Sequence, residues 1–337
     1  MPLDRSKPSP ADRASRDAGA NGSESSLADR VVGYGAGAVA VTIWAAWIVW
    51  TRGAVTGAST GGLSTTPLSA IDVGLLRFGV PAVLLAPVWL RFGVREGFKP
   101  ARTSWASLLA MLGWGAPFVL LITAGMAHAP AAHVGALVPG SMPLWAALIG
   151  WLLFAEGFSP ERKVGLALIL TGASLVIVPA LANAVESGVS GPLAGAPWLM
   201  AASACWACFS IGFARSGIGA VRATGLVAGW STSVFLVLAL WFGTSLPALP
   251  LETLLFHLTT QGLLSGAAAI LAYTVAIERL GGPRAASLSC LVPVLAALLA
   301  VPMLGEALGA LDTAAIVAAS LGVAVVNGAI RLPAATR

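Results

Sequence analysis

Charged and titratable side chains are scarce in this chain, and Arg77 stands out because it lies inside an apolar stretch. Of the 337 residues only 10% are charged and three are His. On scales of membrane insertion, a charge inside an apolar helix costs about 2.5–3.5 kcal/mol, so Arg77 needs a partner or a water-filled cavity. Asp72, five residues earlier, is an acid that its long side chain could reach. We expect Arg77 either to snorkel or to bind a substrate carboxylate.

Three tryptophans form a second group of candidates. Trp residues usually mark the membrane interface, but Trp44 and Trp47 lie deeper, and Trp44-Ala45 recurs as Trp206-Ala207. Their faces could stack on apolar side chains or hold an ammonium group by cation–π contact, worth about 0.5–2 kcal/mol. We expect Trp44, Trp47 and Trp206 either to line a binding cavity or to serve as belt and packing residues.

The remaining polar candidates are weaker. His133 is a possible proton carrier because imidazole titrates near physiological pH, although a His near a helix end is usually an interface residue. Hydroxyl groups inside apolar stretches could bind substrate, or could instead bond to backbone and neighbouring helices. The candidates of this kind are Ser141, Ser210, Ser265, Tyr273 and Ser289.

Enzyme and metal chemistry find little support. Cys205 and Cys208 form a CxxC, but without a second such pair we interpret them as small packing residues of one helix. The stretch 188–191, Gly-Val-Ser-Gly, matches the GxSG of intramembrane proteases, yet it lies in a Gly-rich loop. We therefore predict no enzyme, metal or cofactor, and keep an intramembrane enzyme as a remote alternative.

Composition indicates which elements position these residues. With 57% hydrophobic residues and a mean hydropathy of +0.87, the chain is expected to be an all-α polytopic membrane protein. A span needs about 20 apolar residues. After a tail over 1–30, expected to be disordered and cytoplasmic, ten stretches qualify: 33–51, 69–91, 104–127, 131–154, 163–182, 196–214, 222–244, 255–277, 284–305 and 313–331.

Basic residues set the expected orientation. With the N-terminus inside, 17 of the 19 Lys and Arg fall on the cytoplasmic side, the exceptions being Arg52 and Arg77. Both termini should then be cytoplasmic, with loops 52–68, 182–195 and 245–254 outside. This asymmetry also explains the pI of about 9.6 without a nucleic-acid partner.

The two halves repeat. Pro143 to Glu156 and Pro293 to Glu306 each span thirteen residues, and Gly172 and Gly322 follow at equal distances. Five helices per half is an odd number, so the repeats, 31–182 and 196–331, should be inverted, with substrate bound near the midplane. Proline kinks a helix by removing an N–H and crowding the carbonyl four residues back. Pro139, Pro143 and Pro293 are therefore expected either to act as hinges or to form static kinks that shape the pocket.

These motifs resemble the EamA-type drug/metabolite transporter (DMT) superfamily. The resemblance rests on Leu76-Arg77-Phe78, on Pro143 to Glu156 with Gly172, and on Pro293 to Glu306 with Gly322. Ala155 and Ala315 depart from the pattern. Length and Trp content are similar to bacterial amino-acid exporters of the YddG type.

The resemblance implies export of small metabolites, above all amino acids, from the cytoplasm by alternating access. It implies a cavity lined by predicted helices 1, 3, 4, 6, 8 and 9, with 5 and 10 peripheral. The alternative is a DMT exporter of another solute, such as a nucleobase or drug. The expected partners are the solute and the lipid bilayer, the expected state a monomer or weak homodimer, and the expected location a bacterial-type plasma (inner) membrane.

Overall fold

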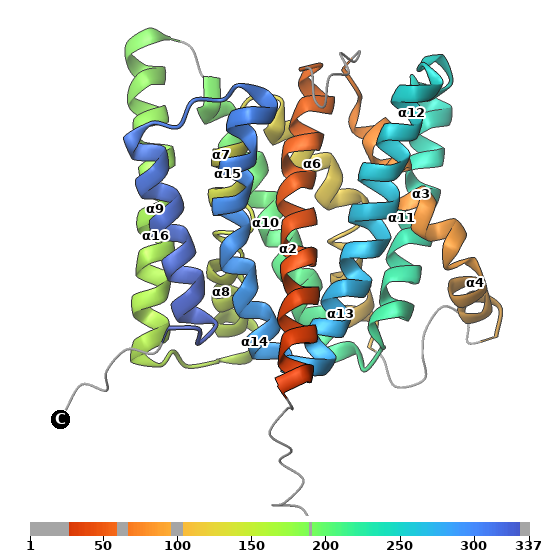
Figure 1. Ribbon diagram of the computed structural model, residues 1–337, viewed down its shortest axis with the longest axis horizontal. Coiled ribbons are helices and arrows are strands. Elements are labelled where there is room, and N and C mark those ends of the chain that lie inside the picture. The colour runs from red at the N-terminus through yellow and green to blue at the C-terminus, as the bar shows by residue number, and fades with distance from the viewer. Residues whose placement is uncertain (1–26, 59–66, 96–103, 189–190, 331–337) are drawn as a thin grey trace, which may run out of the picture.

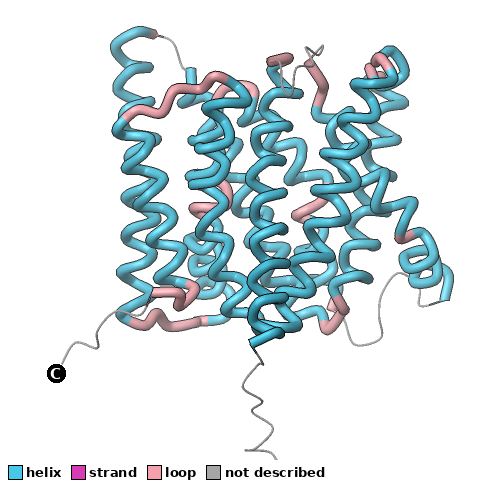
Figure 2. Tube along the Cα trace, in the orientation of Figure 1, coloured by secondary structure: helices cyan, strands magenta, loops and turns pink. Residues whose placement is uncertain are grey.

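The computed structural model describes residues 27–58, 67–95, 104–188 and 191–330 (Figure 1). Most of the predicted tail lies outside these residues. Its last four residues do not: Leu27 already begins the first helix, so the boundary at residue 30 was placed too late. Every element of the described chain is a helix, a turn or a loop (Figure 2).

The described first half of the chain contains long helices and three that are broken by short turns. The helices are α2 (Leu27–Thr56), α3 (Ala70–Leu84), α4 (Ala86–Arg95), α5 (Trp105–Leu112), α6 (Ala116–Met126), α7 (Ala131–Leu137), α8 (Met142–Phe154) and α9 (Pro160–Ser187).

The second half follows the same course. Its elements are α10 (Gly191–Ser216), α11 (Ala220–Phe242), the short η1 (Leu246–Ala248), α12 (Leu251–His257), the π-helical η2 (Leu258–Ala268), α13 (Ala269–Leu280), α14 (Gly282–Ser287), the 3₁₀ turn η3 (Leu288–Cys290), α15 (Leu291–Leu304) and α16 (Ala310–Val326).

Eight of the helical segments are long and apolar enough to cross a membrane. The other two predicted spans are also helical but shorter, because α3 ends at Leu84 and α16 has 17 residues. Large apolar side chains point outward, including Leu240 and Trp241, which are 85% and 81% exposed. Such a surface is unfavourable in water and suits lipid, so the molecule is a polytopic membrane protein. Both ends of the described chain emerge on one face (Figure 1), hereafter the termini face.

Helix breaks interrupt the predicted spans 69–91, 104–127, 131–154 and 284–305. The α7–α8 and α14–α15 breaks lie within one turn before Pro143 and Pro293. The α5–α6 break, at Gly113–Gly115, was not predicted. There a Cβ on Gly113 would lie 2.8 Å from the carbonyl oxygen of Cys205, so glycine allows the turn to approach α10 closely.

The predicted pair of equivalent glycines joins α9 to α16. A Cβ on Gly172 would lie 2.8 Å from the Ala315 carbonyl oxygen, and one on Gly322 would lie 2.7 Å from the Gly165 carbonyl oxygen. The two backbones therefore touch where side chains are smallest, as in membrane helix pairs generally. These helices lie together at one end of the molecule (Figure 1).

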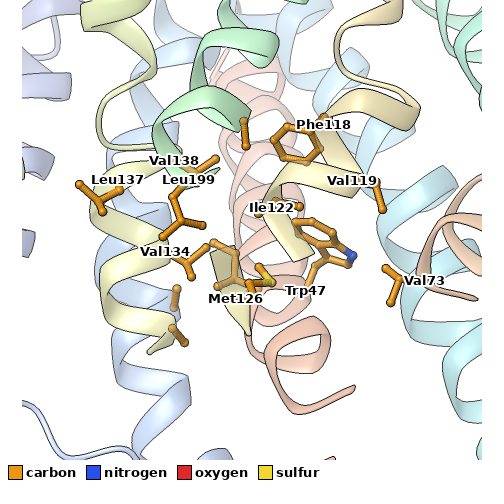
Figure 3. Packing of buried hydrophobic residues seen from close by; sticks show 14 of the residues in the cluster. Trp47, Val73, Phe118, Val119, Ile122, Met126, Val134, Leu137, Val138 and Leu199 are labelled. Atoms are coloured by element: carbon orange, nitrogen blue, oxygen red, sulfur yellow. The ribbon is translucent and has the colours of Figure 1, made fainter. Parts of the chain in front are cut away.

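The apolar core lies between α2, α6, α7 and α10. Trp47, Phe118, Ile122, Met126 and Val134 pack there, each at most 4% exposed (Figure 3). Leu199 of α10, from the second half of the chain, packs in the same cluster, so the core joins the two halves.

Candidate functional site

A cavity of about 540 Å³ brings together most of the predicted binding residues. Helices from both halves border the cavity, and so do the helix interruptions just before α8 and α15. The predicted residues that line it are Trp44, Trp47, Arg77, Pro139, Pro143, Trp206, Ser210, Tyr273 and Ser289.

Aromatic rings form much of the cavity wall. Trp44 lies 5.0 Å from Tyr273 between ring centroids, and Trp206 meets Phe118 edge-on at 6.0 Å. Trp114, which the sequence analysis did not single out, also lines the cavity. Edge-on and tilted pairs are favoured ring arrangements, so the rings hold one another in place while leaving faces open to a solute.

Arg77 is almost fully buried, with 2% of the residue exposed. Its Cζ lies 3.8 Å from the centroid of the Trp47 ring, and its Nη1 donates a hydrogen bond to Ser265 at 2.8 Å. Its Nε–H has no hydrogen-bond partner among the described residues.

The expected contact between Arg77 and Asp72 is absent. The carboxylate of Asp72 instead caps its own helix through Ser69 and accepts hydrogen bonds from Thr244 and Ser245. Asp72 sits in the first turn of α3, where a carboxylate is best used to satisfy free N–H groups. Arg77 therefore has no acid partner in the ion pairs of the described residues.

Gln261 is a site residue that sequence reasoning missed. It is fully buried in η2, accepts a 2.6 Å hydrogen bond from the Trp47 indole and exchanges hydrogen bonds with Thr51. A lone amide inside the apolar stretch 255–277 was a visible signal. Its partners lie more than two hundred residues away, and no local pattern identifies them.

Besides Ser265, three predicted residues do not line the cavity. His133 pairs with Asp312 at 2.8 Å, because α7 and α16 meet there. Ser141 donates to the Leu137 carbonyl, and neighbouring Ser203 donates to the Val138 carbonyl, so these hydroxyls satisfy the backbone at the α7–α8 break. Pro293 packs against Gly135 of α7, while Ser289 and Val292 beside it reach the cavity.

The cavity extends toward the termini face. Its lining includes Arg162, Ala220 and Asn327, which lie at the ends of α9, α11 and α16 on that face. The lining helices thus differ from the expected set, since α9 and α16, expected to be peripheral, contribute residues there. On the other side Ile122 and Val138 belong both to the lining and to the apolar core.

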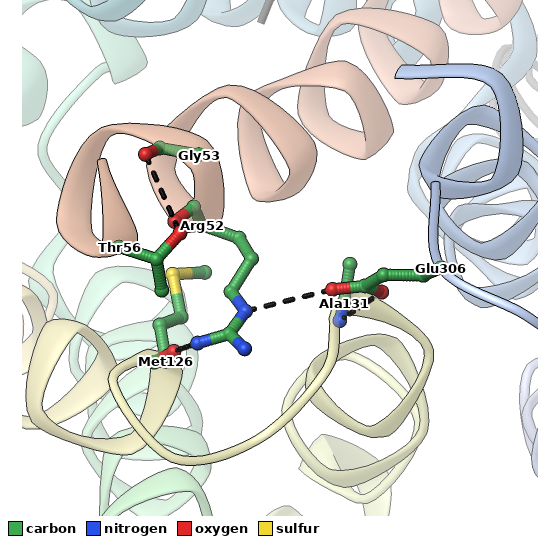
Figure 4. A network of polar contacts seen from close by, with 6 residues as sticks. All are labelled: Arg52, Gly53, Thr56, Met126, Ala131 and Glu306. Carbon is green, nitrogen blue, oxygen red and sulfur yellow. Dashed lines mark hydrogen bonds and ion pairs between the residues drawn. The ribbon is translucent and has the colours of Figure 1, made fainter. Parts of the chain in front are cut away.

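Beyond the core, a polar network ties the opposite face together (Figure 4). Arg52 forms an ion pair with Glu306 at 3.5 Å and donates to the Met126 carbonyl. The carboxylate of Glu306 also accepts a 2.8 Å hydrogen bond from the Ala131 N–H. These contacts join α2, α6, α7 and the loop before α16, so the cavity is closed on this side.

Comparison with known proteins agrees with this architecture. Residues 193–328 match the EamA-like transporter family, which supports the superfamily resemblance for the second half of the chain. A solved crystal structure shares the fold at a TM-score of 0.52 and 19% identity, over 89% of this chain and 96% of that one. No curated protein matches the chain. The matched family is one of transporters, which agrees with the prediction that the chain is not an enzyme.

Proposed function

We propose that the protein exports small metabolites from the cytoplasm, with amino acids that carry apolar or aromatic side chains as the main substrates. The aromatic cavity of about 540 Å³ carries this proposal. Its size lies in the usual range for small-molecule sites, roughly 300–1,000 Å³, and such sites combine apolar walls with a few polar groups. Trp44, Trp206 and Tyr273 would contact the side chain of the solute, and Ser210 and Ser289 would hydrogen-bond it.

The architecture proposed for this function is two inverted five-helix repeats with ten crossings and both termini in the cytoplasm of a bacterial-type inner membrane. It is supported by the emergence of both ends on one face (Figure 1) and by the breaks before Pro143 and Pro293. The cavity reaches the termini face and is closed opposite. On the proposed orientation this is the state that receives solute from the cytoplasm.

Release to the outside requires the closed face to open. In alternating access the cavity is exposed to one side at a time, as the repeats move against each other. The network of Arg52 and Glu306 would part, and the segments around Pro143 and Pro293 would swing. The second candidate function is export of another small solute through the same cavity; the match to the EamA-like transporter family is its support and is neutral about the solute.

Transport by the purified chain in liposomes tests the proposal. A panel of labelled amino acids, with a nucleobase and a drug added, is measured with and without a pH gradient. Trp44→Ala, Trp47→Ala and Trp206→Ala should each reduce amino-acid flux several-fold. Trp241→Ala, at a ring that is 81% exposed on the outer surface, is the matched control and should not. Normal flux in all three cavity variants would remove the cavity from the mechanism.

A further inference from the structure

We infer that Arg77 is an anion-binding group, so that the cavity selects solutes with a carboxylate and rejects amine cations of the same shape. This inference rests on the proposed function and adds to it that the charge of the solute determines how tightly it binds.

The charged side chains among the described residues of the cavity wall are all positive. Among the described residues that line it, Arg77 and Arg162 are the charged ones, and none is Asp or Glu. Arg162 lies 3.9 Å from the carboxylate of Glu156 and stands at the rim on the termini face. The deep positive charge is therefore that of Arg77 alone.

The protein leaves that charge incompletely compensated. A buried guanidinium normally has a carboxylate partner, because desolvation of an ion costs several kcal/mol. Arg77 has one hydrogen bond to a neutral hydroxyl, its Cζ lies within 5.9 Å of the ring centroids of Trp47, Trp114 and Phe78, and its Nε–H is unpartnered. A solute carboxylate would complete the site, since guanidinium and carboxylate form short, charge-assisted hydrogen bonds.

The guanidinium is held in place for such a partner. Ser265 fixes Nη1 from one side, and the Trp47 ring supports the group from another. Gln261, four residues before Ser265, fixes the ring by accepting from its indole N–H. Both belong to the π-helical η2, a geometry often found at functional sites. Gln261 and Ser265 are thus positioning residues for an anion receptor.

Four probes that share a phenyl group test the inference. They are 3-phenylpropionate (an anion), L-phenylalanine (a zwitterion), and L-phenylalaninamide and phenethylamine (which lack the carboxylate). Affinities for the purified full chain are measured by isothermal titration calorimetry. The two carboxylates should bind at least about tenfold more tightly than the two amines, as expected for a charge-assisted hydrogen bond to a buried group.

Variants of Arg77 and Ser265 separate the effect of the positive charge on binding from an effect on folding. Arg77→Gln should abolish the preference for carboxylates, and Arg77→Lys should retain part of it. If Arg77→Gln fails to fold, Ser265→Ala serves instead: it should weaken both carboxylates several-fold and leave phenethylamine unchanged. Equal affinity for acids and amines in the natural chain, an undiminished preference in the folded variants, or no binding of any probe would overturn the inference.

Transport distinguishes this inference from the proposed function. Amino acids and their amides transported alike would leave the function standing and remove the anion site. Selective binding of 3-phenylpropionate without transport of any amino acid would do the reverse.

Discussion

Ala155 occupies a backbone conformation that alanine disfavours. It ends α8 with φ 52°, whereas the equivalent position at the end of α15 is Gly305 with φ 68°. In both places the N–H of the next residue bonds back to the last turn, Glu156 to Gly150 and Glu306 to Ala300. The same helix end is therefore built twice, once with a residue that has a Cβ to accommodate.

Ala155→Gly should stabilise the protein by about 1 kcal/mol, because left-handed backbone costs an L-residue roughly 1–2 kcal/mol and glycine little. Gly305→Ala should cost a similar amount. Thermal unfolding of both variants in one detergent measures the pair. A loss of stability in Ala155→Gly would contradict the strain assigned to this residue.

Single residues also show how far the sequence predicted the site. Trp44, Arg77 and Tyr273 were identifiable because polar or aromatic groups in apolar stretches are few. The pairing of His133 with Asp312 was not predictable, since its partner lies 179 residues further along the chain. Gln261 and Ser203 became meaningful only once the helices that they join were known, because hydrogen bonds across helices leave no spacing in the sequence.

The contact of α9 with α16 depends on the absence of side chains. Gly172→Ala would place a Cβ 2.8 Å from the Ala315 carbonyl oxygen and 2.9 Å from the Ala319 backbone nitrogen. Backbone atoms cannot move aside cheaply, so we expect a loss of about 1–3 kcal/mol, the usual cost of overpacking. Gly35→Ala, where nothing lies within 4 Å, is the matched control and should be neutral. Equal unfolding temperatures for the two variants would contradict this close contact.

The breaks before α8 and α15 should matter for motion. Pro293→Ala restores an N–H and removes the clash with the carbonyl of Ser289, so α15 can continue into η3 and stiffen. Liposome flux should fall severalfold while apparent affinity changes little, and Pro143→Ala should behave alike. Pro302→Ala, in the same helix but exposed, is the control. The hinge role has no support if both Pro143→Ala and Pro293→Ala keep full flux.

Among the elements, the long apolar stretches were predictable, but only some of their interruptions were. All ten predicted stretches are helical, because sustained apolar composition leaves a membrane chain few other ways to satisfy its backbone. The breaks before Pro143 and Pro293 follow from local chemistry. The turn at Gly113 and the π-helical η2 depend on contacts with Cys205, Trp47 and Arg77 from distant helices.

At the scale of the whole molecule, Glu156 and Glu306, the equivalent residues of the two proposed repeats, lie in different environments. Glu306 belongs to the network opposite the termini face, with 16% of its side chain exposed, while Glu156 is 45% exposed and pairs with Arg162 and Arg215. The carboxylate of Glu306 is therefore the more buried of the two, and that of Glu156, on the termini face, is the more exposed.

Glu306→Gln should shift the population toward the outward-open state by about fivefold, the effect of losing roughly 1 kcal/mol of ion-pair energy. In a background without the three cysteines, Ile122→Cys reports access to the cavity floor. Its labelling by a membrane-impermeant reagent applied opposite the termini face should speed up accordingly. Glu156→Gln, the matched change on the other face, should not speed it. Acceleration by both would indicate general loosening.

The tryptophans around the cavity also give the protein an intrinsic fluorescence that should respond to solute binding. Trp44, Trp47, Trp114 and Trp206, out of 12 in the chain, border one space. A solute that enters must displace water from these indole faces, and the motion that releases it must rehydrate them. The wavelength and intensity of tryptophan emission would then report solute binding and release in real time, without a label and without a radioactive substrate.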